Sequence, residues 1–351
     1  ENLALSPASL ELALLMTRAG AIDNTAAEMA AALGMSGLSD DEILSACSQL
    51  MWRANTDGME AANSIWMKQG YGFNPDYVDI CTGDFMADAA EVDFADTKTT
   101  DRINEWASDK THGRIDKMNE QPLPADTVMV LVNALYFLGE WVQPFKANDT
   151  WQESFASPAG DVTVDMMHAE RYVPYYGGDG YSMISLPFQS ESGDGSGFAM
   201  AFLLPAEGSG VTELLGSLDG EYFSEALSGL AQLKVKIKLP KFEYKFGTSF
   251  VDTLKSLGMQ DAFSGEARFD NMTGGQNGLY IDDVLHKCYI RVDELGAEAA
   301  AVTEVMVLES AMEMQEYPEF YLDRPFVFAI YSQLDGTILF LGAVNNPLLN
   351  E

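Results

Sequence analysis

One segment of the chain reads Glu294-Leu295-Gly296-Ala297-Glu298-Ala299-Ala300-Ala301-Val302-Thr303. Its alanine content is that of an ordinary helix, but the residues that follow it, Glu304-Val305-Met306-Val307-Leu308, are rich in β-branched side chains, which favours a strand. Alternate positions through both stretches carry only small or β-branched side chains, namely Ala297, Ala299, Ala301, Thr303, Val305 and Val307. A segment with one such face can enter a tightly packed sheet as an additional strand.

Long apolar runs elsewhere in the chain predict buried strands. Residues 127–138 and 198–204 are nearly continuous apolar runs, which are typical of strands covered on both faces. Near the C-terminus, residues 326–331 and 338–344 flank Asp335-Gly336, a dipeptide that favours a tight turn. These last two runs therefore predict a β-hairpin.

A strict alternation occurs between Leu233 and Leu239, where four apolar residues alternate with three lysines. The apolar residues are Leu233, Val235, Ile237 and Leu239. This pattern predicts a strand with one buried face and one solvated face.

The first third of the chain reads as helical. Ser6-Pro7 predicts a helix start, because proline is tolerated at the first helical position, and Gly20 predicts the end of that helix. Thr25-x-x-Glu28 and Ser39-x-x-Glu42 are capping-box patterns that predict two further helix starts. Helices first and long strands later predict an α+β fold with antiparallel or mixed sheets. Because no long linker divides the chain, we expect one domain over residues 1–351.

Composition narrows the functional classes. The 351 residues include 54 acidic and 20 basic side chains, a formal net charge of −34, which disfavours binding to nucleic acids and to anionic membranes. Hydrophobic residues make up 47% of the chain, enough for a substantial core. No apolar run is long enough to span a membrane. We expect an extracellular or cell-surface protein whose signal peptide is not part of this sequence, with a cytoplasmic location as the alternative.

Residues typical of catalysis and metal binding lack the spacing that such chemistry needs. Cys47, Cys81 and Cys288 form neither a CxxC pair nor a metal knuckle, and we interpret them as buried thiols. The three histidines show no metal-ligand spacing. The loop at 193–197 is similar to a hydrolase serine loop, but Asp194 stands where a glycine is needed. We therefore expect no catalytic residue, no metal and no cofactor.

Several short motifs, in order along nearly the whole chain, resemble those of the serpin family. Each is weak alone, but together and in this order they are highly specific. They are Asn2…Ser6-Pro7-Ala8-Ser9, Thr111-His112-Gly113-Arg114-Ile115, Asn133-Ala134-Leu135-Tyr136-Phe137-Leu138-Gly139-Glu140-Trp141, Leu239-Pro240-Lys241-Phe242, His286-Lys287, Glu294–Thr303 and Arg324-Pro325-Phe326. The acidic composition and the lack of a disulfide framework favour a microbial member of the family. The small and β-branched side chains at alternate positions from Ala297 to Val307 favour an inhibitory one.

The resemblance implies the serpin fold, with three β-sheets, about eight or nine helices and an exposed reactive-centre loop at about residues 294–324. It also implies suicide inhibition of a serine protease. The protease attacks the loop and forms an acyl-enzyme, and it is trapped when the cleaved loop inserts into the large sheet, sheet A, as a new strand. The alternative within the family is a non-inhibitory serpin that acts as a carrier, a chaperone or a protease substrate.

Three groups of residues are implied by matching positions. The hinge, where the loop begins to swing in, covers Gly296, Ala297, Glu298, Ala299, Ala300, Ala301, Val302 and Thr303. The breach, at the top of sheet A, covers Trp141, Lys241 and Glu294. The shutter, whose hydrogen bonds hold the central strands together until they part, covers Ser6, Ser9, Asn133 and His286.

Counting along the loop as inhibitory serpins do places the scissile bond between Ser310 and Ala311. The alternatives are Leu308, Met312 and Met314. No Lys or Arg lies between Arg291 and Arg324, so the loop offers no basic residue to a trypsin- or thrombin-like protease. We therefore expect elastase-, chymotrypsin- or subtilisin-like targets.

The remaining expectations concern partners. Heparin-activated serpins use a basic helix, whereas the stretch taken to correspond to it, residues 76–96, contains no Lys or Arg. We expect no heparin binding, no nucleic-acid partner and no membrane contact. The expected partner is a target serine protease in a covalent complex with a monomeric inhibitor.

Overall fold

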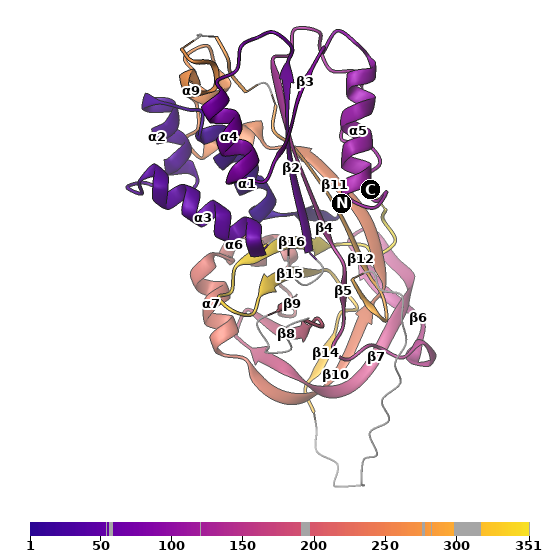
Figure 1. Ribbon diagram of the computed structural model, residues 1–351. Coiled ribbons are helices and arrows are strands. Elements are labelled where there is room, and N and C mark those ends of the chain that lie inside the picture. Colours follow the sequence, from indigo (N-terminus) through magenta and orange to yellow (C-terminus); the bar gives the residue numbers. More distant parts are fainter. Residues whose placement is uncertain are drawn as a thin grey trace. The chain divides into compact units, whose positions relative to one another are not determined.

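The computed structural model describes residues 1–53, 55, 59–119, 121–190, 197–275, 278–281, 283–297 and 317–350. The chain forms two compact units that are interleaved in sequence. Unit 1 comprises Glu1–Leu5, Phe137–Phe246 and Tyr289–Glu351, and unit 2 comprises Ser6–Tyr136 and Gly247–Cys288. The expected α+β class is confirmed, because helices and sheets occur in both units (Figure 1).

In the described part of the chain, a nine-stranded sheet dominates unit 1. Its strands, in spatial order, are β1 (Leu3–Leu5), β16 (Ile338–Val344), β15 (Phe326–Ser332), β9 (Phe198–Pro205), β8 (Tyr181–Pro187), β7 (Gly160–Gly177), β10 (Ala231–Pro240) and β14 (Glu319–Tyr321), while β6 (Thr150–Ser157) pairs with β7. β15 and β16 pair antiparallel, so the predicted hairpin is confirmed. The predicted buried strand at 198–204 is β9, in which every residue is buried.

Shorter elements complete unit 1. Helices α6 (Val211–Ser217) and α7 (Gly220–Ser228) pack on the large sheet, and Phe223 of α7 meets Tyr331 of β15 edge-to-face, 5.6 Å between ring centroids. The 3₁₀ turn η1 (Ala147–Asp149) precedes β6. Two short strands, β5 (Gly139–Glu140) and β13 (Gly296–Ala297), pair with each other.

Unit 2 contains a three-stranded sheet of order β3-β2-β4 and most of the helices. Its elements are α1 (Pro7–Arg18), α2 (Asp23–Ala32), α3 (Asp40–Arg53), β2 (Met59–Lys68), α4 (Pro75–Gly83), β3 (Asp88–Val92), α5 (Lys98–Lys110), β4 (Met129–Phe137), α8 (Val251–Ser256), η2 (Asp261–Phe263) and α9 (Asp270–Thr273). In Figure 1, α1 to α4 gather together around a buried apolar cluster, and α5 lies apart from them. A further pair of strands, β11 (Phe242–Ser249) and β12 (Leu285–Val292), contains the boundary between the units.

Two of the predicted helix starts are confirmed. α1 begins at Pro7 with Ser6 as its N-cap, and the Ser6 hydroxyl oxygen accepts a hydrogen bond from Ser9 N at 3.1 Å. Ser39 and Glu42 form the capping box at α3, since Ser39 N donates to Glu42 Oε2 at 2.8 Å and Glu42 N donates to Ser39 Oγ at 3.3 Å.

The capping box predicted at Thr25 is wrong, because α2 begins two residues earlier, at Asp23. Thr25 and Glu28 serve a different backbone segment. Thr25 Oγ1 accepts a hydrogen bond from Arg268 N at 3.0 Å, and Glu28 Oε2 accepts from Gln260 N and Asp261 N, each at 2.8 Å. The two side chains therefore satisfy backbone donors that are distant in sequence.

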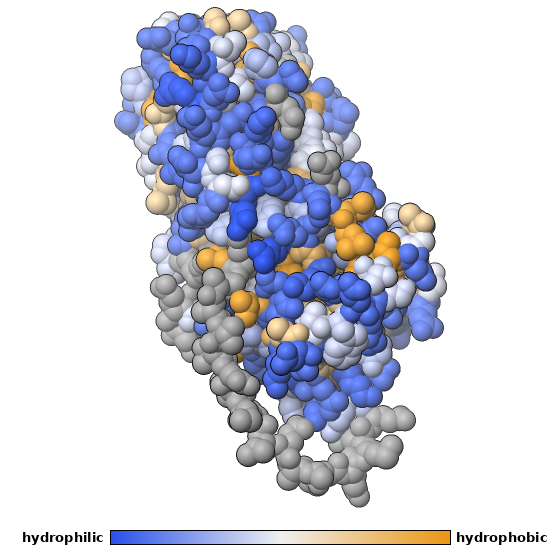
Figure 2. Space-filling model, turned by 90° about the vertical axis from the view of Figure 1, so that its right-hand side faces the viewer, coloured by the Kyte–Doolittle hydropathy of each residue, from blue (hydrophilic) through white to orange (hydrophobic). Residues whose placement is uncertain are grey.

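Three further expectations need correction. Leu233 is 39% exposed, because β10 extends beyond the apolar core that buries Val235 and Ile237. The apolar run at 127–138 forms β4 over Met129–Phe137 and then leaves Leu138 exposed. The stretch 76–96 is not one helix, since it contains most of α4 and then β3. The surface in view in Figure 2 is mostly hydrophilic, in keeping with the net charge of −34.

Candidate functional site

The residues expected at the breach lie together in unit 1. Lys241 Nζ lies 2.9 Å from Glu294 Oε2, and the two side chains are 36% and 15% exposed. Burial favours a higher pKa for Glu294, but hydrogen bonds from Lys241 and from backbone N–H outweigh burial, and the pKa is lowered. Glu294 is therefore held as a carboxylate in a half-buried ion pair.

Trp141 fixes the backbone on both sides of Glu294. Its indole Nε1 donates to Asp293 O at 3.1 Å, and its backbone N donates to Leu295 O at 2.8 Å. The indole is buried and stacks on Phe188, with ring centroids 4.5 Å apart and planes inclined by 12°. A rigid aromatic pair thus anchors the point where the expected loop begins.

Asp293 was not singled out from the sequence, but it shapes the turn at this point. Its two carboxylate oxygens accept hydrogen bonds from Leu295 N at 2.9 Å and from Arg291 at 2.8 Å, and Asp293 N donates to Gly296 O at 3.0 Å. The sequence did carry a signal for this turn. An Asp followed three residues later by a glycine is typical of an Asx turn, in which the Asp side chain accepts a hydrogen bond from the backbone N–H two residues on.

Gly296 and Ala297, the described residues of the expected hinge, form β13. Gly296 pairs with Glu140 and Ala297 with Gly139 of β5, antiparallel, and both hinge residues are buried. Gly296 has φ of +152°, and a Cβ at this position would overlap Gly139 O and lie 2.8 Å from Glu140 Cα. A glycine is therefore required by both conformation and space.

The rest of the expected hinge and the candidate cleavage residues lie outside the described residues. They are Glu298, Ala299, Ala300, Ala301, Val302 and Thr303 of the hinge and Leu308, Ser310, Ala311, Met312 and Met314 of the loop.

The residues expected at the shutter lie together in unit 2, at the N-terminus of α1. Ser6 N donates to His286 Nε2 at 3.0 Å. His286 is 4% exposed, and burial lowers its pKa to about 4. At neutral pH the imidazole is therefore uncharged, and its Nε2 lone pair accepts the backbone hydrogen bond.

The same cluster continues as a chain of side-chain hydrogen bonds. Ser9 Oγ donates to Asn133 Oδ1, and Asn133 Nδ2 donates to Asn63 Oδ1 at 2.6 Å. Asn63 Nδ2 in turn donates to Phe85 O at 2.9 Å. Buried polar groups thus connect α1, β4 and β2 within unit 2.

Asn63 is a residue of this cluster that the sequence reading missed. It is 1% exposed and lies in β2 in phase with Ala61, Ile65 and Met67, on the buried face. An Asn at an apolar position of an alternating strand was the available signal, because a buried amide needs partners.

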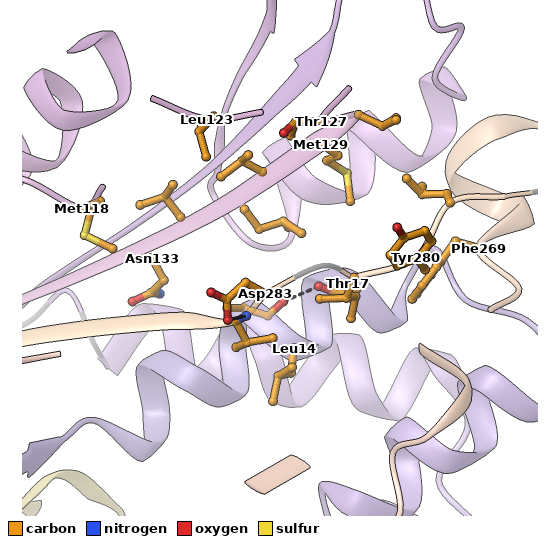
Figure 3. Close-up of a pocket in the computed structure, with 18 of the residues that line it drawn as sticks. Leu14, Thr17, Met118, Leu123, Thr127, Met129, Asn133, Phe269, Tyr280 and Asp283 are labelled. Atoms are coloured by element: carbon orange, nitrogen blue, oxygen red, sulfur yellow. Dashed lines mark hydrogen bonds between the residues drawn. The ribbon is translucent and has the colours of Figure 1, made fainter. Parts of the chain in front are cut away.

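A cavity of about 620 Å³ lies beside this cluster in unit 2. Figure 3 shows Leu14 and Thr17 of α1 on one side and Thr127 and Met129 on the other, with Phe269 and Tyr280 at one end. Ser9, Asn133 and His286 also line it. Among the described strands β4 ends the order β3-β2-β4, so the cavity runs along a sheet edge.

The cysteines are free and buried, as expected, and burial is the main cause that raises the pKa of each thiol to about 12. Within the described residues, no group of three or more His, Cys, Asp or Glu side chains is placed to hold a metal ion. Among the helices that the structure describes, none is long and apolar enough to cross a membrane.

Comparison with known proteins assigns the family. The family model described as serpin (serine protease inhibitor) matches residues 1–347. The chain belongs to the serpin family. Serpins are in general protease inhibitors rather than enzymes, and the α+β architecture described above is the serpin fold.

Three relatives of this serpin match nearly its full length. An uncharacterized serpin-like protein of Thermococcus kodakarensis is 34% identical over 99% of this chain and 81% of its own length. Iripin-8 of Ixodes ricinus is 31% identical over 98% of this chain and 88% of its own length. Among solved structures, the thermophilic serpin tengpin in its native state superposes with a TM-score of 0.89 at 31% identity, covering 99% of this chain and 89% of tengpin.

Proposed function

We propose that this serpin is a suicide inhibitor of serine proteases that traps the acyl-enzyme by inserting its cleaved loop as a strand beside β4. The observation that carries this proposal is the alternation of small and β-branched residues from Ala297 to Val307, which begins at the last residue of the paired strand β13. A strand with such a face can be buried without overpacking or unpaired charge.

The geometry of unit 2 supports the proposal. The cavity of about 620 Å³ lies along the edge of β4, where backbone groups of an added strand can find partners. Its lining includes the hydrogen-bonded residues Ser9, Asn133 and His286. We assign these three and Ser6 the shutter role, in which their hydrogen bonds must rearrange when a strand enters.

The geometry of unit 1 supports a breach role for Trp141, Lys241 and Glu294. The ion pair at 2.9 Å and the two Trp141 hydrogen bonds hold the start of the loop in one position. Gly296, Ala297 and the residues up to Thr303 then form the hinge, with insertion proceeding from the two residues already paired with β5.

The proposed targets are elastase-, chymotrypsin- or subtilisin-like proteases that cut between Ser310 and Ala311, with Leu308, Met312 and Met314 as alternative sites. The support is the absence of Lys and Arg between Arg291 and Arg324. We further propose a monomer that acts at the cell surface or outside the cell without heparin, in keeping with its net charge of −34.

The test is incubation of the full chain with neutrophil elastase, followed by a denaturing gel and intact-mass measurement. The expected result is a boiling-resistant covalent adduct together with a released C-terminal peptide that starts at Ala311. Pancreatic chymotrypsin and subtilisin are assayed in parallel. Cleavage of the loop without an adduct by all three proteases would contradict the inhibitory mechanism and favour a substrate-type serpin.

A further inference from the structure

The cavity of unit 2 has the size and the lining of a small-molecule site. Its volume of about 620 Å³ falls within the range of about 300–1,000 Å³ that is typical of ligand pockets. Large apolar side chains from three separate parts of the chain line it, and Figure 3 shows them around the same space. They include Leu14, Met118, Leu123, Met129 and Phe269. An apolar molecule can therefore bury much of its surface here.

Several polar side chains that line the cavity already have hydrogen-bond partners within unit 2. Thr17 Oγ1 donates to a backbone oxygen of α1 at 2.9 Å, and Ser9 Oγ donates to Asn133 Oδ1. Asp283 Oδ1 accepts from Val284 N at 2.8 Å. These groups do not need a ligand to satisfy them.

His286 differs from them. Its Nε2 accepts the hydrogen bond from Ser6 N, so the neutral imidazole must carry its proton on Nδ1. The ring of Phe250 packs edge-on against the imidazole, 5.9 Å between centroids, but no oxygen or nitrogen of the described residues accepts a hydrogen bond from this N–H. His286 is 4% exposed, and a buried donor without an acceptor costs free energy. A molecule in the cavity, which His286 lines, can supply that acceptor.

The charges around the cavity disfavour an anionic ligand. Asp126 and Asp283 are among the lining residues, and the described part of the lining contains no Lys or Arg. A carboxylate or a phosphate would therefore meet two aspartates with no cation to balance its charge. A cationic group, in turn, cannot accept the hydrogen bond that His286 offers. A neutral molecule with an acceptor oxygen fits both conditions.

We propose that the cavity of unit 2 binds a neutral, largely apolar molecule whose carbonyl or ether oxygen accepts a hydrogen bond from His286 Nδ1. The apolar body of the ligand packs between α1 and β4, against Leu14 and Met129. A strand that enters beside β4 needs the same space, so a bound ligand favours the intact form over the inserted form. This last consequence rests on the proposed inhibitory function, whereas the binding site does not.

The first test compares three probes of nearly the same shape by calorimetric titration of the full chain. Benzophenone is neutral and has a carbonyl oxygen, diphenylmethane lacks that oxygen, and 4-benzoylbenzoate adds a carboxylate. We expect benzophenone to bind at least about fivefold more tightly than either of the other two, the scale of one hydrogen bond. Equal affinities for benzophenone and diphenylmethane, or no binding of benzophenone, would overturn the proposal. Tighter binding of 4-benzoylbenzoate would overturn the neutral class of ligand.

The second test locates the bound probe. Near-ultraviolet light links benzophenone to C–H bonds beside it, and peptide mass measurement then identifies the linked residues. We expect links within 9–17, 118–133 or 269–286, the segments that line the cavity, and links confined to other segments would overturn the site. The links are mapped on the wild type, so this test does not depend on the folding of a variant.

Two variants add a matched comparison. Ala13→Phe places a phenyl ring in the cavity that Ala13 lines, and it should abolish linking at these segments. Ala31→Phe makes the same change at an exposed position of α2 and should leave the linking as it is in the wild type. A folded Ala13→Phe protein that is linked as strongly as the Ala31→Phe protein would contradict the assignment of the cavity.

The consequence for inhibition is measured separately, with neutrophil elastase, chymotrypsin and subtilisin. Saturating benzophenone should raise the ratio of cleaved inhibitor to covalent adduct, and diphenylmethane at the same concentration should raise it less. An unchanged ratio would overturn the competition with the inserted strand. A wild type that is cleaved without being trapped, with no probe present, would overturn the inhibitory function, and the titrations and the links would still decide the binding site.

Discussion

His286 is the residue whose chemistry is most directly measurable. Its buried imidazole must stay neutral to accept the hydrogen bond from Ser6 N, and burial lowers its pKa from the ordinary value of 6.5 to about 4. Between pH 4 and pH 6.5, His286 is therefore mostly protonated in the unfolded chain but mostly neutral in the folded chain. The stability that neutral His286 provides is fully present above pH 6.5 and is lost as the pH falls toward 4.

We expect the free energy of unfolding to drop by about 3 kcal/mol between pH 6.5 and pH 4 because of this one group. The variant His286→Gln keeps an acceptor for Ser6 N but cannot take up a proton, so it should lack this part of the pH dependence. Urea unfolding at a series of pH values measures both. Identical pH slopes for the two proteins would show that His286 does not titrate as described.

Gly296 gives a second prediction for a single residue. A methyl group there would overlap Gly139 O, and φ of +152° is unfavourable for any side chain, so Gly296→Ala should break the pairing between β13 and β5. We expect a loss of about 1–3 kcal/mol in the free energy of unfolding. Gly216→Ala in α6, where no atom lies within 4 Å of the added carbon, is the control and should be neutral or slightly stabilising. Equal effects of the two substitutions would refute the steric argument.

At the level of elements, the proposed insertion assigns opposite faces to neighbouring loop residues. Ala301→Arg would place a charge on the face of small residues, so insertion should slow and the inhibitor should be cleaved instead of trapping the protease. Ala300→Arg lies on the other face and should still trap. The ratio of covalent adduct to cleaved inhibitor on a denaturing gel measures this difference. Two variants that behave alike would mean that the alternation does not set the orientation of the strand.

The elements also show what a sequence reading can and cannot predict. The hairpin of β15 and β16 and the buried strand β9 were predictable because apolar runs and an Asp-Gly turn are local signals. The partners of Thr25 and Glu28 were not, because the donors that they satisfy lie more than 230 residues away in the chain. Asn63 was missed for a similar reason, since its hydrogen bonds go to Asn133 of β4 and to the backbone of Phe85, between α4 and β3.

At the level of the whole molecule, the family could be predicted from ordered motifs, because they are spread over nearly the full length that the family model matches. The pairing of β13 with β5 could not, since two-residue strands carry no periodicity. The hydrogen bond from the Trp141 indole to Asp293 O could not be predicted either, because it joins two segments that are distant in sequence.

The interleaving of the two units leads to a prediction about cooperativity. The chain passes between the units at four points, so neither unit is a continuous piece of chain. We therefore propose that they unfold together as one domain, in a single transition. Far-UV circular dichroism and tryptophan fluorescence should give coincident urea midpoints, since tryptophans lie in both units, Trp52, Trp66 and Trp106 in unit 2 and Trp141 and Trp151 in unit 1. Two separated midpoints would contradict a single domain.

The central claim is that the cleaved loop becomes a strand of the sheet beside β4, and thermal unfolding of the intact and the loop-cleaved protein tests it most directly. An inserted strand pairs its backbone and buries a face of small side chains, so the cleaved protein should melt higher by about 10 °C or more, the scale of several kcal/mol for a chain of this size. An unchanged or lower melting temperature after clean cleavage in the loop would contradict insertion, and with it the proposed mechanism of inhibition.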